Sequence, residues 1–158
     1  MSKRSIIWFR RDLRISDHPA LLAAISESSE IVPVFILDPK LIKTCGSKRL
    51  AYLGQSLRAL DESLGNNLQV IAGDQLTVLK DLQKKYDAES VHISAEYEPY
   101  GATRDKNIEE GGIKLIRTGS PYAVAPGRVL KPSDNTPYRV YTPFYKAWCA
   151  HGWRKPAD

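Results

Sequence analysis

Five short apolar runs alternate with segments of helical character, and this alternation limits the fold more than any other feature. The runs are predicted strands at Ile6–Phe9, Ile31–Leu37, Leu68–Ile71, Ser90–Ile93 and Lys114–Ile116. Their nearly continuous apolar character is typical of strands that are covered on both faces. Strands that alternate with helices form parallel sheets with right-handed crossovers. The sequence therefore predicts an α/β fold, a doubly wound (Rossmann-like) five-stranded parallel sheet with helices on both faces.

Helical spacing is clearest at Lys48–Leu64, where leucines recur every three or four residues along one face. A second helix, Ala20–Ser28, follows a proline and Asp17, which we interpret as its capping residue. A third is predicted to begin at Gly73-Asp74, and a weaker fourth follows Pro99. Each of these helices separates two predicted strands, as the fold requires.

The net charge and the cysteines narrow the class of protein. A formal net charge of +5 favours anionic partners only mildly, because acidic and basic residues are interleaved along the chain. Cys45 and Cys149 have neither metal-ligand spacing nor the pattern of a disulfide framework, which favours a reducing compartment. No apolar run is long enough for a signal peptide or a membrane span. We expect a cytoplasmic domain without membrane contact.

Catalytic signatures are absent from the sequence. There is no GxGxxG turn, no phosphate-binding GxxxxGK[ST] loop and no serine in a GxSxG turn. The histidines His18, His92 and His151 are scattered, and His92 lies within an apolar strand, where a core role is favoured over a catalytic one. The chain by itself is therefore not predicted to be an enzyme.

Three polar segments follow predicted strands and should meet at one edge of the sheet. They are FRRDLR after the first strand, LDPKLIKTCGSKR after the second and EYEPYGATRD after the fourth. Ligands of open parallel sheets bind beyond the carboxyl ends of the strands, where the strand order reverses. If the order is 3-2-1-4-5, FRRDLR and EYEPYG face each other across one crevice. Arg14 is predicted to fix its loop through Asp12 or Asp17, whereas Arg10 and Arg11 fit a structural and a binding role equally well.

The C-terminal part has a different character. Five prolines lie between Pro121 and Pro143, and Tyr141–Trp153 packs five aromatic residues into thirteen positions. One interpretation is a segment that wraps back and buries its aromatic rings on the sheet. The other is a linker whose aromatic rings await a second domain.

Five segments carry a resemblance that covers essentially the whole chain. WFRRDLRISDHPAL, FILDP, SKRLAYLGQSLRALDESL, EPYGATRD and PYRVYTPFYKAW resemble the N-terminal domain of the DNA photolyase and cryptochrome family. The resemblance implies that residues 1–130 form an α/β domain that binds a light-harvesting antenna chromophore, and that 131–158 begin an interdomain linker. In the family, a helical domain follows that carries FAD, the pyrimidine-dimer pocket and the DNA-binding face. We find no such domain in this sequence, so we expect FAD and DNA to be bound only through that missing partner, and the chain alone to be inactive in repair.

The same resemblance assigns residues to the antenna. Glu96 and Glu98 would accept hydrogen bonds from the ring, Arg49 would reach its polar end, and Tyr100-Gly101 replaces the asparagine-glutamate pair of members that bind a folate. This favours 8-hydroxy-5-deazaflavin or an FMN-like antenna over a folate. The other implied contacts are the apolar wall Phe35, Ile36 and Leu37, together with Arg11, Asp12 and Arg104.

Two other functions stay open at this point. The chain could be a freestanding flavin- or nucleotide-binding domain without repair activity. It could also be a partner of a separately encoded FAD domain that binds no chromophore itself.

Overall fold

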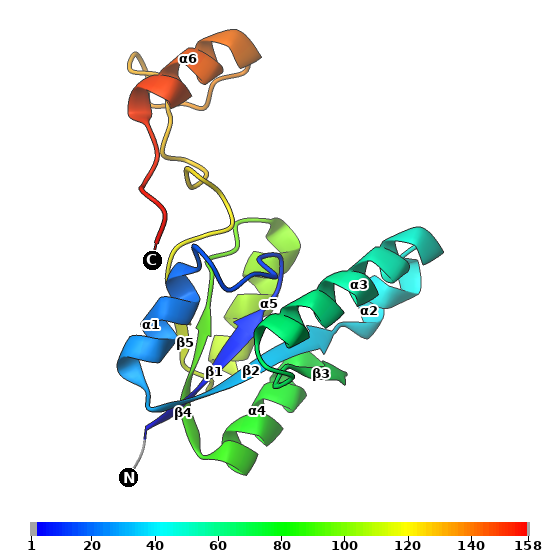
Figure 1. The fold of residues 1–158 in the computed structure, drawn as a ribbon. Coiled ribbons are helices and arrows are strands. Elements are labelled where there is room, and N and C mark those ends of the chain that lie inside the picture. Colours follow the sequence, from blue (N-terminus) through cyan, green and yellow to red (C-terminus); the bar gives the residue numbers. More distant parts are fainter. Residues whose placement is uncertain (1–2, 158) are drawn as a thin grey trace.

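A computed structural model describes residues 3–157, and its centre is a five-stranded parallel sheet (Figure 1). The strands are β1 (Arg4–Phe9), β2 (Glu30–Leu37), β3 (Gln69–Ala72), β4 (Ala88–Ile93) and β5 (Leu115–Arg117). The helices are α1 (Pro19–Glu27), α2 (Pro39–Thr44), α3 (Ser47–Ser63), α4 (Gln75–Tyr86), α5 (Pro99–Glu110) and α6 (Tyr141–His151). The predicted α/β fold class is confirmed, and α1 and α3 begin and end within one residue of the predicted bounds.

The strand order is β3-β2-β1-β4-β5, and all neighbouring strands are parallel. The chain moves from β1 outward to β3 and then returns to place β4 on the other side of β1. The register pairs Phe9 of β1 with Phe35 of β2, and Ile7 with His92 of β4. The order therefore reverses between β1 and β4, which is the arrangement that brings FRRDLR and EYEPYG to one crevice.

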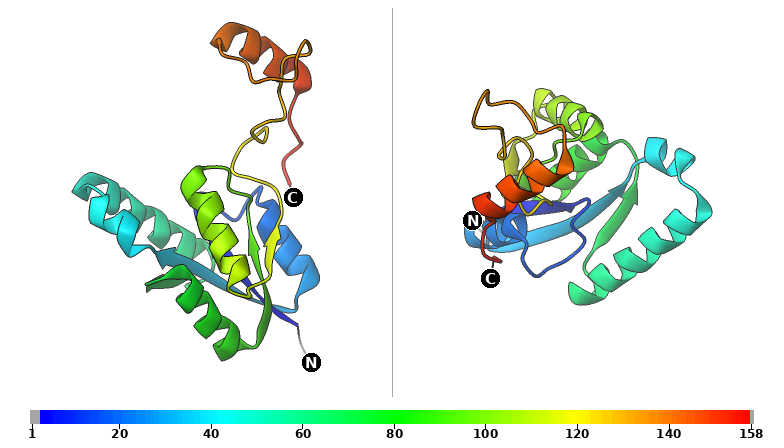
Figure 2. Two further views of the ribbon diagram at one scale, coloured as in Figure 1. Left: turned by 180° about the vertical axis from the view of Figure 1, so that it is seen from behind. Right: turned by 90° about the horizontal axis from the view of Figure 1, so that it is seen from above.

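Helices cover both faces of the sheet (Figure 2), and successive residues of β1 contribute to the cores on opposite faces. Ile6 and Trp8 belong to one core, and Ile7 and Phe9 belong to the other. The first core contains residues of α4 and α5, namely Val78, Leu79, Leu82 and Ile108. The second contains residues of α1 and α3, namely Ala20, Leu21 and Leu60. His92 is fully buried, as predicted, and burial lowers the pKa of its imidazole.

Two local features differ from the sequence-based expectation. The segment after β2 contains the short helix α2, because Asp38 accepts a hydrogen bond from the Lys40 N–H and proline occupies the first turn. The interpretation of Asp17 as the cap of α1 is wrong. Asp17 has a positive φ of 50°, and His18, the residue directly before the helix, accepts the hydrogen bond from the Leu21 N–H instead.

The C-terminal segment leaves the sheet and forms α6 at a distance from it (Figures 1 and 2). No residue of α6 is buried, so its aromatic rings do not pack on the sheet. They pair with each other: Tyr141 stacks on Tyr145 and Trp148 on Trp153, with ring centroids 5.7 and 4.8 Å apart. The interpretation as a segment buried on the sheet is therefore wrong, although the chain end returns to bind Asp17 through the Arg154 guanidinium and the Ala157 N–H.

Removing this segment is expected to leave the core intact. A chain that ends at Thr136 should keep its melting temperature within about 2 °C of the full chain, because it loses only surface contacts. It should also self-associate less in sedimentation velocity, because exposed aromatic rings promote association. Arg154→Ala in the full chain removes the guanidinium contact with Asp17 but keeps α6, and serves as the control. A drop of about 10 °C on truncation would show that the segment belongs to the core.

Candidate functional site

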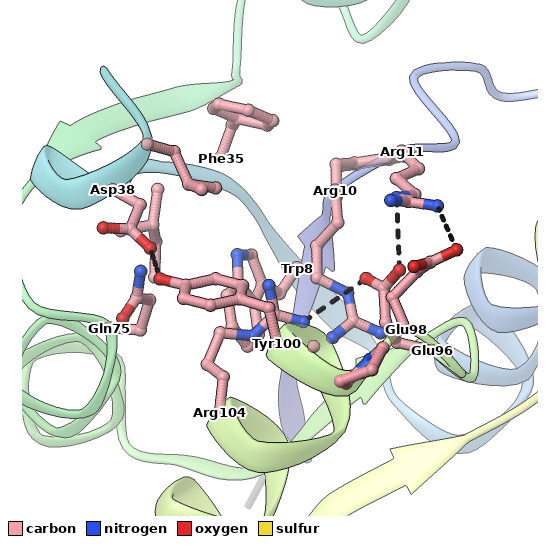
Figure 3. A pocket seen from close by; sticks show the side chains of 15 residues that line it. Trp8, Arg10, Arg11, Phe35, Asp38, Gln75, Glu96, Glu98, Tyr100 and Arg104 are labelled. Atoms are coloured by element: carbon pink, nitrogen blue, oxygen red, sulfur yellow. Dashed lines mark hydrogen bonds and ion pairs between the residues drawn. The ribbon is translucent and has the colours of Figure 1, made fainter. Parts of the chain in front are cut away.

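A cavity of about 360 Å³ opens at the carboxyl ends of β1 and β2, where they face the first turns of α5 (Figure 3). Its walls come from three separate loops and from the start of α4. The lining residues are Trp8, Phe9, Arg10, Arg11, Phe35, Ile36, Asp38, Leu41, Gln75, Glu96, Glu98, Pro99, Tyr100, Gly101 and Arg104. The cavity therefore occupies the edge of the sheet where ligands of such folds bind.

Two arginines cover the ring of Trp8 at the base of the cavity. The Arg10 side chain is only 7% exposed, and its Nη1 donates to both carboxylate oxygens of Asp105, at 2.7 and 2.9 Å. The Arg104 Nη2 lies 2.8 Å from Asp105 and 3.5 Å from Glu96. The guanidinium carbons of Arg10 and Arg104 lie 5.1 and 4.8 Å from the Trp8 ring centroid. Burial lowers the pKa of Arg10, while the Asp105 carboxylate opposes this shift. Arg10 thus has a structural role in the cavity.

Glu96 brings a buried hydrogen-bond acceptor to the cavity. Its side chain is 7% exposed, and its Oε1 lies 3.1 Å from the Arg11 Nε in an ion pair. Nevertheless, Oε1 accepts no hydrogen bond from any residue within 3–157. Arg11 therefore balances the charge of this oxygen, but the hydrogen-bonding capacity of the oxygen is unused. A ligand N–H or O–H could satisfy it.

Gly101 is required for the position of Glu96. A Cβ atom at residue 101 would lie 2.0 Å from the Glu96 Cγ and 2.7 Å from its Cδ, so no side chain can be added without moving Glu96. Gly101 lies in the first turns of α5 and is itself buried. The glycine therefore lets the carboxylate lie flat against the helix.

Tyr100 joins α5 to α2 across the cavity. Its hydroxyl donates to the Asp38 Oδ2, and the Asp38 Oδ1 accepts from the Lys40 N–H at 2.8 Å (Figure 3). The hydrogen bond to Asp38 raises the pKa of the Tyr100 hydroxyl. Burial raises the pKa of Asp38, but the hydrogen bonds from Tyr100 and Lys40 outweigh it and lower the pKa overall. Both groups therefore keep the protonation states that maintain the link at neutral pH.

Comparison with known proteins identifies the family. Residues 5–158 match the family model described as DNA photolyase. The chain belongs to the DNA photolyase family. It is 33% identical over 95% of its length to a deoxyribodipyrimidine photo-lyase of Synechococcus, of which it covers 33%. The chain spans about a third of the length of the curated relatives it matches.

Solved structures agree with this family assignment. A bacterial class III photolyase from Agrobacterium tumefaciens superposes with a TM-score of 0.83 at 31% identity, covering 99% of this chain and 33% of that one. An archaeal photolyase from Sulfolobus tokodaii, described with two FAD molecules and a novel light-harvesting cofactor, gives 0.81 at 28% identity. It covers 97% of this chain and 36% of that one. This chain therefore has the fold of the photolyase N-terminal domain.

Most residues that the photolyase resemblance assigned to the antenna line this one cavity. They are Arg11, Phe35, Ile36, Glu96, Glu98, Tyr100, Gly101 and Arg104. Three others do not line it. Leu37 lines a separate groove beside α3, Arg49 lies exposed on α3, and Asp12 is buried in the loop after β1. Asp38 accepts a hydrogen bond from the Tyr100 hydroxyl. Within residues 3–157 it forms no ion pair with Arg49.

The sequence reasoning missed several lining residues of this photolyase-family domain. Trp8 lies in the predicted first strand and is buried in the core, but it also lines the cavity, and Asp38 and Gln75 are not among the predicted site residues. Gln75 follows β3, whose carboxyl end lies at the same edge of the sheet as those of β1 and β2. Its place directly after a strand that ends at this edge of the sheet could have identified Gln75 as a site residue.

Asp12 fixes the loop that follows β1. Its Oδ2 accepts from the Ser94 Oγ and lies 3.1 Å from the His18 Nε2. Because the His18 Nδ1 accepts a hydrogen bond, a neutral imidazole carries its proton on Nε2, facing Asp12. Burial raises the pKa of Asp12, but the adjacent His18 imidazole and the hydrogen bond from Ser94 outweigh it and hold the pKa well below its usual range. Arg14 donates to the Ser16 and Asp17 carbonyls, so its predicted loop-fixing role through Asp17 is confirmed.

The depressed pKa of Asp12 predicts a contribution to acid sensitivity. A carboxyl whose pKa is lower in the folded state stabilises the fold above its unfolded pKa and loses this effect as the pH falls. Between about pH 5 and pH 2, the free energy of unfolding of the wild type should therefore fall more steeply than that of Asp12→Asn. Urea unfolding at several pH values measures this. Asp81→Asn, on the exposed face of α4, is the control, and equal slopes for wild type and Asp12→Asn would contradict the prediction.

Two further findings concern residues 3–157. No cluster of three or more histidine, cysteine, aspartate or glutamate side chains could hold a metal ion. No helix in this range has both the length and the hydropathy needed to cross a bilayer.

Proposed function

We propose that this domain binds a flat, flavin-like light-harvesting chromophore in the cavity between β1, β2 and α5. When bound, such a chromophore absorbs light and passes its excitation to a second chromophore. The domain itself supplies position, orientation and exclusion of water. This role needs no nucleophile or acid–base pair, in keeping with the residues that line the cavity.

The observation that carries the proposal is the buried Oε1 of Glu96, which forms an ion pair with Arg11 but accepts no hydrogen bond within residues 3–157. Flavin and deazaflavin rings have an imide N–H at one edge, and the buried Glu96 Oε1 accepts no hydrogen bond within residues 3–157. Arg11 lies beside it and can pair with ribityl or phosphate oxygens. Phe35 and Ile36 provide apolar surface for the ring. The residues present therefore fit this class of ligand.

The geometry at Gly101 favours a flavin-like ring over a folate. By resemblance, folate-binding members have an asparagine-glutamate pair where this chain has Tyr100-Gly101. Even a Cβ atom at residue 101 would collide with Glu96, so a folate-type glutamate does not fit this arrangement. We propose 8-hydroxy-5-deazaflavin or FMN as the antenna.

We also propose that this domain acts together with a helical domain that binds FAD. Residues 1–130 would form the antenna domain, and 131–158, including α6, would begin the linker. The exposed aromatic rings of α6 support this, because a partner domain would cover them. In the complete photolyase, FAD excited by blue light would repair pyrimidine dimers, and DNA would be bound by the helical domain.

Glu96→Gln provides the test of the proposed function. Titration of the protein with FMN, 8-hydroxy-5-deazaflavin and methenyl-tetrahydrofolate, followed by fluorescence, should show tighter binding of the first two. Glu96→Gln should weaken flavin binding about tenfold, because it replaces a charged acceptor of a buried hydrogen bond with a neutral one. Glu110→Gln, at the exposed far end of α5, makes the same charge change and should bind normally.

Two results would contradict the proposal. The first is tightest binding of the folate. The second is flavin binding that Glu96→Gln leaves unchanged, since the ring edge would then lie elsewhere.

A further inference from the structure

A second cavity, of about 580 Å³, lies between α3 and the edge strand β3, and we name it the α3 groove. Its lining is Leu37, Pro39, Ile42, Leu50, Leu53, Gly54, Leu57, Val70 and Ala72, with no charged side chain among them. Of the leucines that form the apolar stripe of α3, only Leu57 and Leu60 are buried. Val70 of β3 remains 44% exposed. The apolar face of α3 therefore extends beyond the surface that this domain covers.

The segment that forms one wall of the groove is strongly basic. Residues 39–60 contain five basic side chains and no acidic one, namely Lys40, Lys43, Lys48, Arg49 and Arg58. The whole chain has 23 basic and 18 acidic side chains, so outside this segment the two kinds are equal in number. Acidic and basic residues are therefore not interleaved within 39–60, although Asp61 and Glu62 follow directly in the last turn of α3. None of the five enters an ion pair within residues 3–157.

Several of these cations flank the apolar lining. The Arg58 Nη1 lies 3.7 Å from where a Cβ atom would be at Gly54, which lines the groove, so this guanidinium lies at its rim. Arg49 directly precedes Leu50, and helical spacing puts it on the opposite side of the leucine stripe from Arg58. Lys43 follows Ile42 on α2. The groove is thus an apolar strip with positive charge on both sides.

We propose that the α3 groove docks an acidic amphipathic helix of a partner protein. The apolar strip runs from Leu50 to Leu57, about two helical turns, which matches apolar residues at positions i, i+3 or i+4, and i+7 of a bound helix. Glutamate or aspartate on the flanks of that helix would face Arg49 and Arg58. Charge complementarity of this kind speeds association and selects partners.

A second copy of this chain does not have that chemistry. Its own exposed apolar helix, α6, lies in a stretch from residue 135 to 157 that contains Arg139, Lys146, Arg154 and Lys155 but no acidic residue. Docking of α6 into the groove would bring like charges together. Nucleic acid would be attracted to the cations but would find no aromatic ring in the groove on which a base could stack.

Synthetic peptides provide the test of this docking site. The probe is a fluorescein-labelled peptide with leucine at i, i+3, i+4 and i+7 and glutamate at the flanking positions. Fluorescence polarisation should show saturable binding that weakens with salt. Arg58→Glu and Leu53→Asp should each weaken binding at least about tenfold. Lys80→Glu, an exposed cation on α4, makes the same charge reversal as Arg58→Glu and should leave binding unchanged.

Each alternative occupant gives a distinct result. Equal binding of a peptide with serine in place of leucine would overturn the proposal, because charge alone would then explain it. The proposal would also be overturned if a single-stranded oligonucleotide bound more tightly than the peptide and Arg58→Glu abolished that binding. Self-association of the protein that Leu53→Asp removes would overturn it as well. Failure of the leucine-glutamate peptide to bind would also overturn it. Circular dichroism checks that each variant folds. If Leu53→Asp does not fold, the peptide affinity of Arg58→Glu, a substitution on the helix surface, still tests the proposal.

Discussion

Gly101→Glu is expected to abolish the binding of a flavin-like chromophore, with a loss of affinity above about a hundredfold. The new side chain has no room, because its Cβ atom alone would lie 2.0 Å from the Glu96 Cγ. Glu96 must then move, and two carboxylates compete for Arg11 and Arg104 in a cavity of about 360 Å³. The ring would lose both its space and its acceptor.

Ala102→Glu is the matched control for this substitution. Residue 102 is the next position of α5, it is exposed, and glutamate there adds the same charge outside the cavity. FMN titration of both variants, together with their melting temperatures, separates a blocked site from an unfolded protein. Binding by folded Gly101→Glu within about threefold of the wild type would show that the ring does not approach α5 at this turn.

Asp105→Ala is expected to destabilise the domain by about 3–5 kcal/mol. The Asp105 carboxylate is 3% exposed and receives hydrogen bonds from both Arg10 and Arg104. Without it, the buried Arg10 guanidinium keeps only the Ser94 carbonyl as a hydrogen-bond partner among the described residues. An unpaired buried charge is much less favourable than the pair. Urea-induced unfolding measures the change.

An exposed ion pair on the same helix gives the comparison. Glu109 pairs with Arg117 at 2.6 Å, a distance as short as the buried contact, but both side chains are more than a third exposed. Glu109→Ala should therefore change stability by less than about 1 kcal/mol. Similar losses for Asp105→Ala and Glu109→Ala would show that burial does not determine the strength of the Arg10–Asp105 contact.

The sheet and its helices were predictable because their signals are local and repeated. Apolar runs and the leucine stripe of α3 predict the correct elements. The strand order is the one on which the predicted crevice depended, but the sequence alone does not determine it. Helix α2 was missed because one cap and one proline specify it, without an apolar stripe. Asp17 was misinterpreted because the cap position depends on a φ angle that composition does not reveal.

The cavity was only partly predictable, for a geometric reason. Sequence shows which segments reach the edge of the sheet but not where individual side chains point there. Leu37 follows Phe35 and Ile36 directly, yet it faces the α3 groove. The contact between Glu96 and Gly101 depends on the path of the coil between β4 and α5. The buried Arg10–Asp105 pair joins residues 95 positions apart and has no sequence pattern of its own.

The two guanidinium groups over Trp8 have a consequence for photochemistry. Indole readily gives an electron to an excited flavin, and this transfer would dissipate the absorbed light. Each cation stabilises the neutral ring by about 0.5–2 kcal/mol, and at about 5 Å it would repel an oxidised indole by roughly 3 kcal/mol at an effective dielectric constant of about 20. Arg10 and Arg104 lie at that range. The Asp105 carboxylate pairs with both guanidinium groups and offsets part of this effect. In the proposed antenna complex, the remaining positive charge would make Trp8 harder to oxidise and would favour energy transfer by the excited chromophore.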